Sequence, residues 1–142
     1  YNSKRLMNKS HLIQGVWNFF AKHRTQFENE DFMDVLHKAR LGTNDFVFLD
    51  PPYDTAFSSY STGISFSRYP DIFNWMCDTP AKFLMVTKET DFINELLEKA
   101  RLRNNNLFTR TFLKQYQVNI KNRNQRSATH LLIANYDMDV LS

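Results

Sequence analysis

Residues 46–53 read Phe-Val-Phe-Leu-Asp-Pro-Pro-Tyr, and this stretch decides both the fold and the place of the candidate site. The run Phe46–Leu49 is short, continuous and apolar, as buried parallel strands are. The two prolines that follow cannot continue a central strand, because each lacks the N–H that the sheet requires. We therefore expect a central strand over 46–49 that stops at Asp50, with the Asp50 carboxylate at its C-terminal tip.

Outward from this strand, apolar spacing predicts helices and strands in alternation. Further strands are expected at 83–86, 107–118 and 131–134, and helices at 11–23 and 31–40, from Pro70 onward and after a Thr90 cap. Ser10 is the expected N-cap of the first helix and Gly42 the terminator of the second. Residues 1–10 are polar and basic, and 54–68 hold seven Ser or Thr, so both segments are expected to be loops. This order predicts an α/β fold, in which ligands bind beyond the carboxyl ends of the strands.

Length and composition restrict the class of protein. With 142 residues, of which 42% are hydrophobic, the chain fits one folded domain, and no apolar stretch approaches the ~18 residues of a membrane span. The one cysteine, Cys77, excludes an internal disulfide, and with no Cys/His cluster beside it no metal site is expected. A reduced, cytoplasmic setting fits these features. The first residue is Tyr1 and not Met, so we expect a piece of a longer protein.

Basic residues gather towards the C-terminal end of the chain. The formal net charge is +3, and the segment 101–126 holds seven Lys or Arg and no acidic residue. Its last part carries what we call the basic cluster, which consists of Lys121, Arg123 and Arg126. Such charges either contact the phosphates of a nucleic acid or form a solvated face, and the sequence leaves both interpretations open.

The segment Asp50-Pro51-Pro52-Tyr53 at a strand tip suits one kind of substrate group. Two prolines make a stiff turn, so the Asp50 carboxylate and a proline carbonyl can face one site as two hydrogen-bond acceptors. Two acceptors can hold both hydrogens of an exocyclic amino group, while the Tyr53 ring stacks on the heterocycle. Such a base must leave the double helix first, because its amino group is unreachable inside the stack. The alternative is an ordinary turn that Asp50 closes.

Three further segments join Asp50–Tyr53 in resembling the amino-methyltransferases, and more closely the Dam-type DNA adenine-N6 methyltransferases. Phe27–Phe32, which reads Phe-Glu-Asn-Glu-Asp-Phe, stands before the strand as that family's cofactor-adenine segment does. Thr55–Tyr60, followed by Phe66, resembles the family's loop after the motif. His130–Tyr136 resembles its closing strand.

The resemblance implies the C-terminal half of a Rossmann-like methyltransferase sheet, with the last strand antiparallel. Residues 1–10 would be the end of a target-recognition region or a linker, and residues 11–142 the C-terminal part of the catalytic domain. The implied activity is methyl transfer from S-adenosylmethionine to the N6 amino group of adenine in DNA. The implied site residues are Asp50, Pro51, Pro52 and Tyr53 for catalysis, Asp31, Phe32 and Asp50 for the cofactor, and Phe57, Tyr60, Lys121, Arg123 and Arg126 for DNA.

Three departures from the family keep alternatives open, and one of them is that the family's lysine-bearing N-terminal segment is missing. The Phe-x-Gly-x-Gly cofactor loop is absent, so the chain would hold half of a cofactor site, to be completed by a missing N-terminal part or a partner chain. Thr87-Lys88 stands where many members have Ser-Asn. Asp31 and Phe32 could instead be a helix cap and a core residue. The chain could also be a non-catalytic DNA-binding subunit or remnant, or part of a methyltransferase acting on cytosine N4 or RNA adenine.

Overall fold

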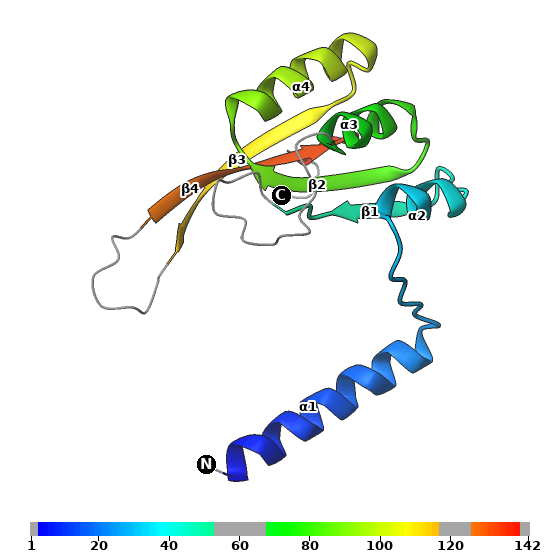
Figure 1. Cartoon of the computed structure of the whole chain (residues 1–142), viewed down its shortest axis with the longest axis vertical. Coiled ribbons are helices and arrows are strands. Elements are labelled where there is room, and N and C mark those ends of the chain that lie inside the picture. The colour runs from blue at the N-terminus through cyan, green and yellow to red at the C-terminus, as the bar shows by residue number, and fades with distance from the viewer. Residues whose placement is uncertain (1–2, 53–67, 117–125, 140–142) are drawn as a thin grey trace. The chain divides into compact units, whose positions relative to one another are not determined.

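The computed structural model describes residues 3–52, 68–116 and 126–139, with side chains over 12–52, 68–114 and 128–139 (Figure 1). The chain divides into two compact units, Tyr1–Val35 and Leu36–Ser142. The second unit contains every strand that the structure describes, and it contains Asp50.

The first unit contains helix α1, Ser3–Lys22, which is 20 residues long (Figure 1). The expectation of a loop over residues 1–10 is therefore wrong for 3–10, and Ser10 lies inside the helix instead of capping it. A polar and basic composition predicts exposure to water, but Lys, Arg, Leu and Met are all good helix formers. The apolar side of α1 is not buried within its own unit, since Leu12 is 69% and Trp17 67% exposed.

Helix α2, Phe32–Lys38, spans the boundary between the units. Asp31 stands at its start, where Oδ1 accepts a hydrogen bond of 3.0 Å from the backbone N–H two residues on. The helix ends at Lys38, and Arg40 after it has a left-handed backbone with φ of 45°. The prediction that Gly42 ends the helix is therefore wrong. Gly42 instead forms the turn into the sheet, where its N–H donates to Asp45 Oδ2 at 2.7 Å.

Four strands of the second unit form one mixed sheet (Figure 1). They are β1 Phe46–Leu49, β2 Lys82–Lys88, β3 Phe108–Tyr116 and β4 Arg126–Ala134. The order across the sheet is β1-β2-β4-β3; β1 and β2 are parallel, and β4 is antiparallel to both β2 and β3. The expected alternation of elements and the antiparallel last strand are thus confirmed.

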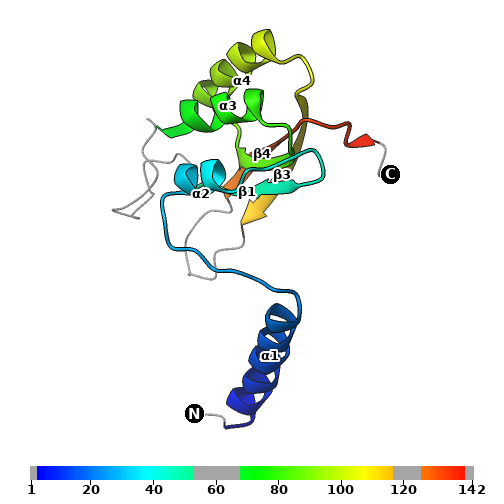
Figure 2. The same cartoon turned by 90° about the vertical axis from the view of Figure 1, so that its right-hand side faces the viewer.

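Two helices, α3 (Tyr69–Asp78) and α4 (Asp91–Arg103), lie together on one face of this sheet (Figure 2). Thr90 caps α4 as expected, because its hydroxyl accepts a 3.3 Å hydrogen bond from the backbone N–H three residues on. Every second residue of β2 from Phe83 to Thr87 is buried. The core therefore lies between the sheet and the two helices, and β2 is its central strand.

β1 lies at the edge of the described sheet, so within the described residues it is not the central, fully buried strand that the sequence predicts. Its neighbour among the described strands is β2 alone. Phe46 and Phe48 are 55% and 58% exposed, whereas Val47 and Leu49 are half-buried. The apolar run predicted a strand correctly, but it carries no information on how many neighbours that strand has. As a result, β1 has an exposed aromatic face beside an edge that no described strand covers.

No helix in the described part of the chain is long and apolar enough to cross a membrane. The described residues also include no group of three or more His, Cys, Asp and Glu side chains that could hold a metal ion. Cys77, on α3, is a free thiol.

Candidate active site

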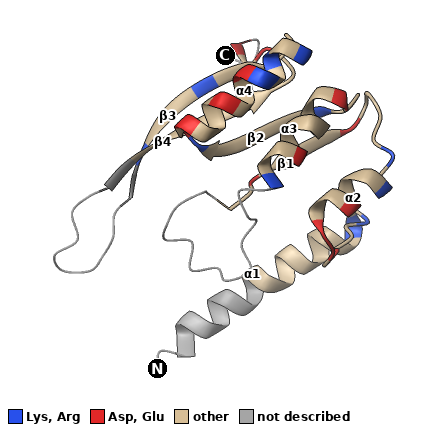
Figure 3. Ribbon diagram, turned by 45° about the horizontal axis from the view of Figure 1, so that its top comes forward, with Lys and Arg blue, Asp and Glu red and all other residues tan. Residues whose placement is uncertain are grey.

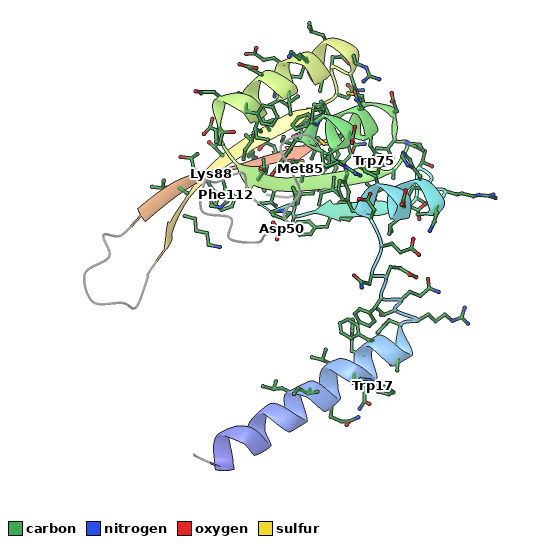
Figure 4. All side chains as sticks on the ribbon, in the orientation of Figure 1. Trp17, Asp50, Trp75, Met85, Lys88 and Phe112 are labelled. Carbon is green, nitrogen blue, oxygen red and sulfur yellow. The ribbon has the colours of Figure 1, made fainter. Side chains whose placement is uncertain are left out.

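Asp50 directly follows β1, at the carboxyl ends of the parallel pair β1 and β2, where the sequence predicts it (Figure 4). The residue is exposed, and its carboxylate has no hydrogen bond or ion pair with the other described residues. In open α/β sheets, ligands bind outside the carboxyl ends of the strands. The position therefore offers a negatively charged acceptor to a ligand, and none of its lone pairs is used in holding the described fold together.

The two prolines after Asp50 differ in their surroundings. Pro51 is buried and Pro52 is exposed. The carbonyl of Pro52 accepts a hydrogen bond from the Tyr69 hydroxyl, with 2.9 Å between the oxygens. No hydrogen bond to the Pro51 carbonyl is found within the described ranges. The turn thus has one proline carbonyl already paired, and it has two further acceptors, the Asp50 carboxylate and the Pro51 carbonyl, which the described residues do not use.

Tyr69 is fully buried although it begins helix α3. Pro70 beside it favours a helix start, because the fixed φ of proline suits the first turn. The Tyr69 ring meets Phe92 of α4 edge to face, with 6.2 Å between centroids. Its hydroxyl also lies 3.5 Å from Thr87 Oγ1 on β2. Tyr69 has no feature in the sequence that marks it as a site residue. The one local signal, a Tyr-Pro pair at a helix start, gives no information on which residues its hydroxyl contacts.

Asp31 and Phe32, the expected cofactor residues, stand at the start of α2. Asp31 is exposed and Phe32 half-buried. Asp31 caps the helix, so the alternative interpretation of Asp31 as a helix cap is confirmed. A carboxylate has about four acceptor sites, so capping does not exclude a second role. Asp31 belongs to the first unit and Asp50 to the second, and each is placed within its own unit.

Several expected site residues lie outside the described part of the chain. Tyr53, Phe57, Tyr60, Lys121 and Arg123 fall there, and of Arg126 only the backbone is described, as the first residue of β4. Their assigned roles stay predictions.

Within 101–126, the described basic residues that precede the basic cluster are engaged in contacts within the fold. Arg103 donates to Asn74 at 2.7 Å and to Asp78 at 3.0 Å, and Arg110 pairs with Asp139. Along α4 the acidic residues lie in the N-terminal part of the helix and the basic residues in its C-terminal part (Figure 3). These contacts favour the solvated-face interpretation for this part of 101–126, which leaves the basic cluster as the candidate for phosphate contact.

The first unit contains a hollow between α1 and the segment that follows it. The hollow is lined by Leu12, Ile13, Val16, Trp17, Phe20, Ala21, Thr25 and Phe27. Apart from the Thr25 hydroxyl and the Trp17 indole N–H the lining side chains are apolar, so the hollow offers no carboxylate to hold an amino group. It is a surface suited to packing and carries none of the chemistry at Asp50.

Comparison with known proteins gives two matches. Residues 2–112 match the family described as D12 class N6 adenine-specific DNA methyltransferase. The chain is also 31% identical over 112 residues to the Type II methyltransferase M.CviBI of Paramecium bursaria Chlorella virus NC1A. That alignment includes 75% of this chain and 40% of the relative, so the chain spans less than half the length of that relative. Asp50, the two prolines and Tyr69 all lie inside the matched segment.

Proposed function

The chain belongs to the D12 class N6 adenine-specific DNA methyltransferases, and we propose that the enzyme of which it is part transfers a methyl group from S-adenosylmethionine to adenine N6 in DNA. The observation that carries this proposal is the placement of Asp50, an exposed carboxylate without a described partner, at the carboxyl end of a parallel strand pair. The family supplies the substrate class, and the strand tip supplies an acceptor of the required kind.

The proposed roles follow from the chemistry of an aromatic amine. Its nitrogen lone pair is delocalised into the ring, so the nitrogen is a poor nucleophile until its two hydrogens are held out of the ring plane. The Asp50 carboxylate would accept one hydrogen and the Pro51 carbonyl the other. Tyr53 would stack on the adenine ring, and Phe57 and Tyr60 would contact the flipped base or fill the space that it leaves. The negative charge of Asp50 would also stabilise the positive charge that develops on the nitrogen.

The residues present fit part of an S-adenosylmethionine site. When bound, S-adenosylmethionine supplies an electrophilic methyl group. Phe32 would pack against its adenine ring and Asp31 would accept from the polar edge, for which the half-buried ring and the exposed carboxylate are suited. Asp50 would border the methyl end. The chain has three glycines, none of them in a Gly-x-Gly pair, so the cradle for the rest of the molecule must come from elsewhere in the enzyme.

We further propose that the described sheet is one side of a Rossmann-like sheet. The strand order β1-β2-β4-β3, with β4 antiparallel, supports this as the C-terminal side. β1 would then become a central strand once a further strand pairs with its outer edge, and Phe46 and Phe48 would become buried. Burial of these two side chains would stabilise the enzyme, because removing apolar surface from water contributes about 25 cal/mol per Å² to the free energy of folding.

The experiment is methyl transfer from radiolabelled S-adenosylmethionine to DNA, followed by digestion and nucleoside analysis, with the complete enzyme. Label in N6-methyladenine is expected. Label in N4-methylcytosine, or transfer to RNA adenine instead of DNA, would refute the proposed substrate. An Asp50→Ala enzyme assayed in parallel shows whether any label depends on this site.

A second function has an observation of its own. The absent glycine loop and the 40% coverage of the relative agree with a DNA-binding subunit or remnant without activity. Calorimetry of the 142-residue chain with S-adenosylmethionine tests whether the chain binds the cofactor without the rest of the enzyme. We expect weak binding or none by the chain alone, and methyl transfer only when the rest of the enzyme is present. Micromolar binding by the chain alone would show that the cofactor site is completed by another route, such as a second copy.

A further inference from the structure

The hydroxyl of Tyr69 donates a 2.9 Å hydrogen bond to the carbonyl of Pro52, the second proline of the motif. We infer that Tyr69 is a positioning residue: by occupying the Pro52 carbonyl it fixes the turn so that the Pro51 carbonyl acts with Asp50 on the amino group. The inference rests on the proposed function and adds to it a residue from a different element, 17 positions further along the chain.

A turn with two prolines retains little backbone freedom. Each pyrrolidine ring fixes φ near −65°, and the peptide units are planar. The directions of the Pro51 and Pro52 carbonyls therefore depend mainly on one ψ angle each. A hydrogen bond to the Pro52 carbonyl removes one of these two freedoms. It also prevents the Pro52 carbonyl from turning towards the amino group in competition with that of Pro51.

Tyr69 is itself held by residues of three elements. Its side chain is fully buried, and its ring meets Phe92 edge to face. A phenol has a single proton. Because that proton points to the Pro52 carbonyl, the 3.5 Å contact with Thr87 Oγ1 must have Thr87 as the donor. Residues from α3, α4 and β2 thus hold one hydroxyl in place, and this hydroxyl holds the motif.

The rate of methyl transfer depends on how accurately the Pro51 carbonyl is positioned. An acceptor pair activates an amino group only in one geometry, and small displacements of such groups are costly. A misplacement of ~1 Å can lower a rate roughly a hundredfold. If the Pro52 carbonyl were released, the turn would sample other ψ values and the Pro51 carbonyl would spend less time in place. The loss would appear in kcat more than in the binding of DNA, which depends on many other contacts.

The test uses Tyr69→Phe, which keeps the buried ring and removes only the hydroxyl. In the complete enzyme, kcat is expected to fall roughly tenfold or more, with the KM for DNA and for S-adenosylmethionine within about threefold of wild type. Ile93→Val is the matched control, because Ile93 is equally buried on α4 but its side chain has no group that could hydrogen-bond to the motif. It should lower the unfolding temperature and leave kcat unchanged. Thr87→Val, which removes the weaker contact, should give a smaller loss of kcat.

The hydrogen bond itself can be followed without activity. Pro52-Tyr53 is the one Pro-Tyr pair in the sequence. Labelling proline with ¹³C at its carbonyl and tyrosine with ¹⁵N in the 142-residue chain therefore gives a single carbonyl–amide NMR correlation. Tyr69→Phe should move the carbonyl shift, and Ile93→Val should not.

Either of two results would overturn the inference. One is an unchanged carbonyl shift in Tyr69→Phe, and the other is a changed shift together with a wild-type kcat, which would leave Tyr69 a purely structural residue. Failure of the proposed function is distinguishable, because it appears in the wild-type enzyme as absence of N6-methyladenine.

Discussion

Two aspartates flank β1, and their surroundings differ. We therefore predict that replacement by Ala mainly lowers stability at one of them and mainly lowers the rate of methyl transfer at the other. Asp45, before the strand, accepts a 2.7 Å hydrogen bond from the N–H of Gly42. Asp50, after the strand, is exposed and has no partner among the described residues. Asp50→Ala should therefore change the free energy of unfolding by less than about 0.5 kcal/mol. Asp45→Ala should lower the free energy of unfolding by about 1 kcal/mol, which corresponds to a decrease of about 2–4 °C in the unfolding temperature.

Methyl transfer should respond in the reverse order. A hydrogen bond to a charged acceptor contributes about 1.5–3 kcal/mol, and each 1.36 kcal/mol is a factor of ten in rate. Loss of this bond alone lowers kcat roughly 10- to 150-fold in Asp50→Ala, and lost alignment adds to it. Asp50→Asn keeps a neutral acceptor and should lose less. Asp45→Ala should retain wild-type kcat.

Single-turnover transfer of labelled methyl groups measures the rate, and urea denaturation measures the stability. Half of wild-type activity in Asp50→Ala would refute the proposed role. A larger loss of stability in Asp50→Ala than in Asp45→Ala would show that Asp50 is a structural residue.

Three further predictions concern other parts of the chain. The Asn135 side chain accepts from the Phe83 N–H at 3.0 Å and donates to the Ala81 carbonyl at 2.8 Å, so in urea denaturation Asn135→Ala should lose about 1–3 kcal/mol of stability. Burial raises the pKa of the Cys77 thiol, partly offset by Arg103, so at pH 8 alkylation should be slower in the folded chain than in urea. Replacing the basic cluster with Ala should weaken DNA binding on all sequences alike and flatten its salt dependence, by a slope of roughly 0.9 per lost phosphate contact. A change in the methylated sequence would instead mean that the cluster contacts bases.

Local patterns predicted the elements whose causes are local. The cap at Thr90 needs only a hydroxyl three residues before a backbone N–H, and the sequence alone located it. The strand at 83–86 was predicted correctly because it is apolar over its whole length, with Phe83 and Met85 buried and the two residues between and after them half-buried. The helix over 3–10 was missed because polar composition reports exposure to water and not backbone conformation.

Contacts between distant residues could not be predicted in this way. Nothing near Tyr69 in the sequence indicates that its hydroxyl meets the Pro52 carbonyl, because that meeting depends on how α3 packs over the end of β1. The same holds for Asn135, whose partners lie 52 and 54 positions earlier. Residues that hold a site from another element are therefore found in the structure, whereas the residues of the motif were found in the sequence.

β1 shows how the fold and the proposed chemistry depend on each other. Its residues alternate between half-buried Val47 and Leu49 and exposed Phe46 and Phe48, although all four are apolar. A strand with water on one face and one edge has no need of two phenylalanines there, so the composition fits a strand that is enclosed in the complete enzyme. The same enclosure would hold Asp50 from both sides, because the position of a strand tip is fixed by hydrogen bonds to both neighbouring strands. On this reasoning the described chain would carry the acceptors of the amino group, and a further strand paired with the outer edge of β1 would supply the rigidity that those acceptors need.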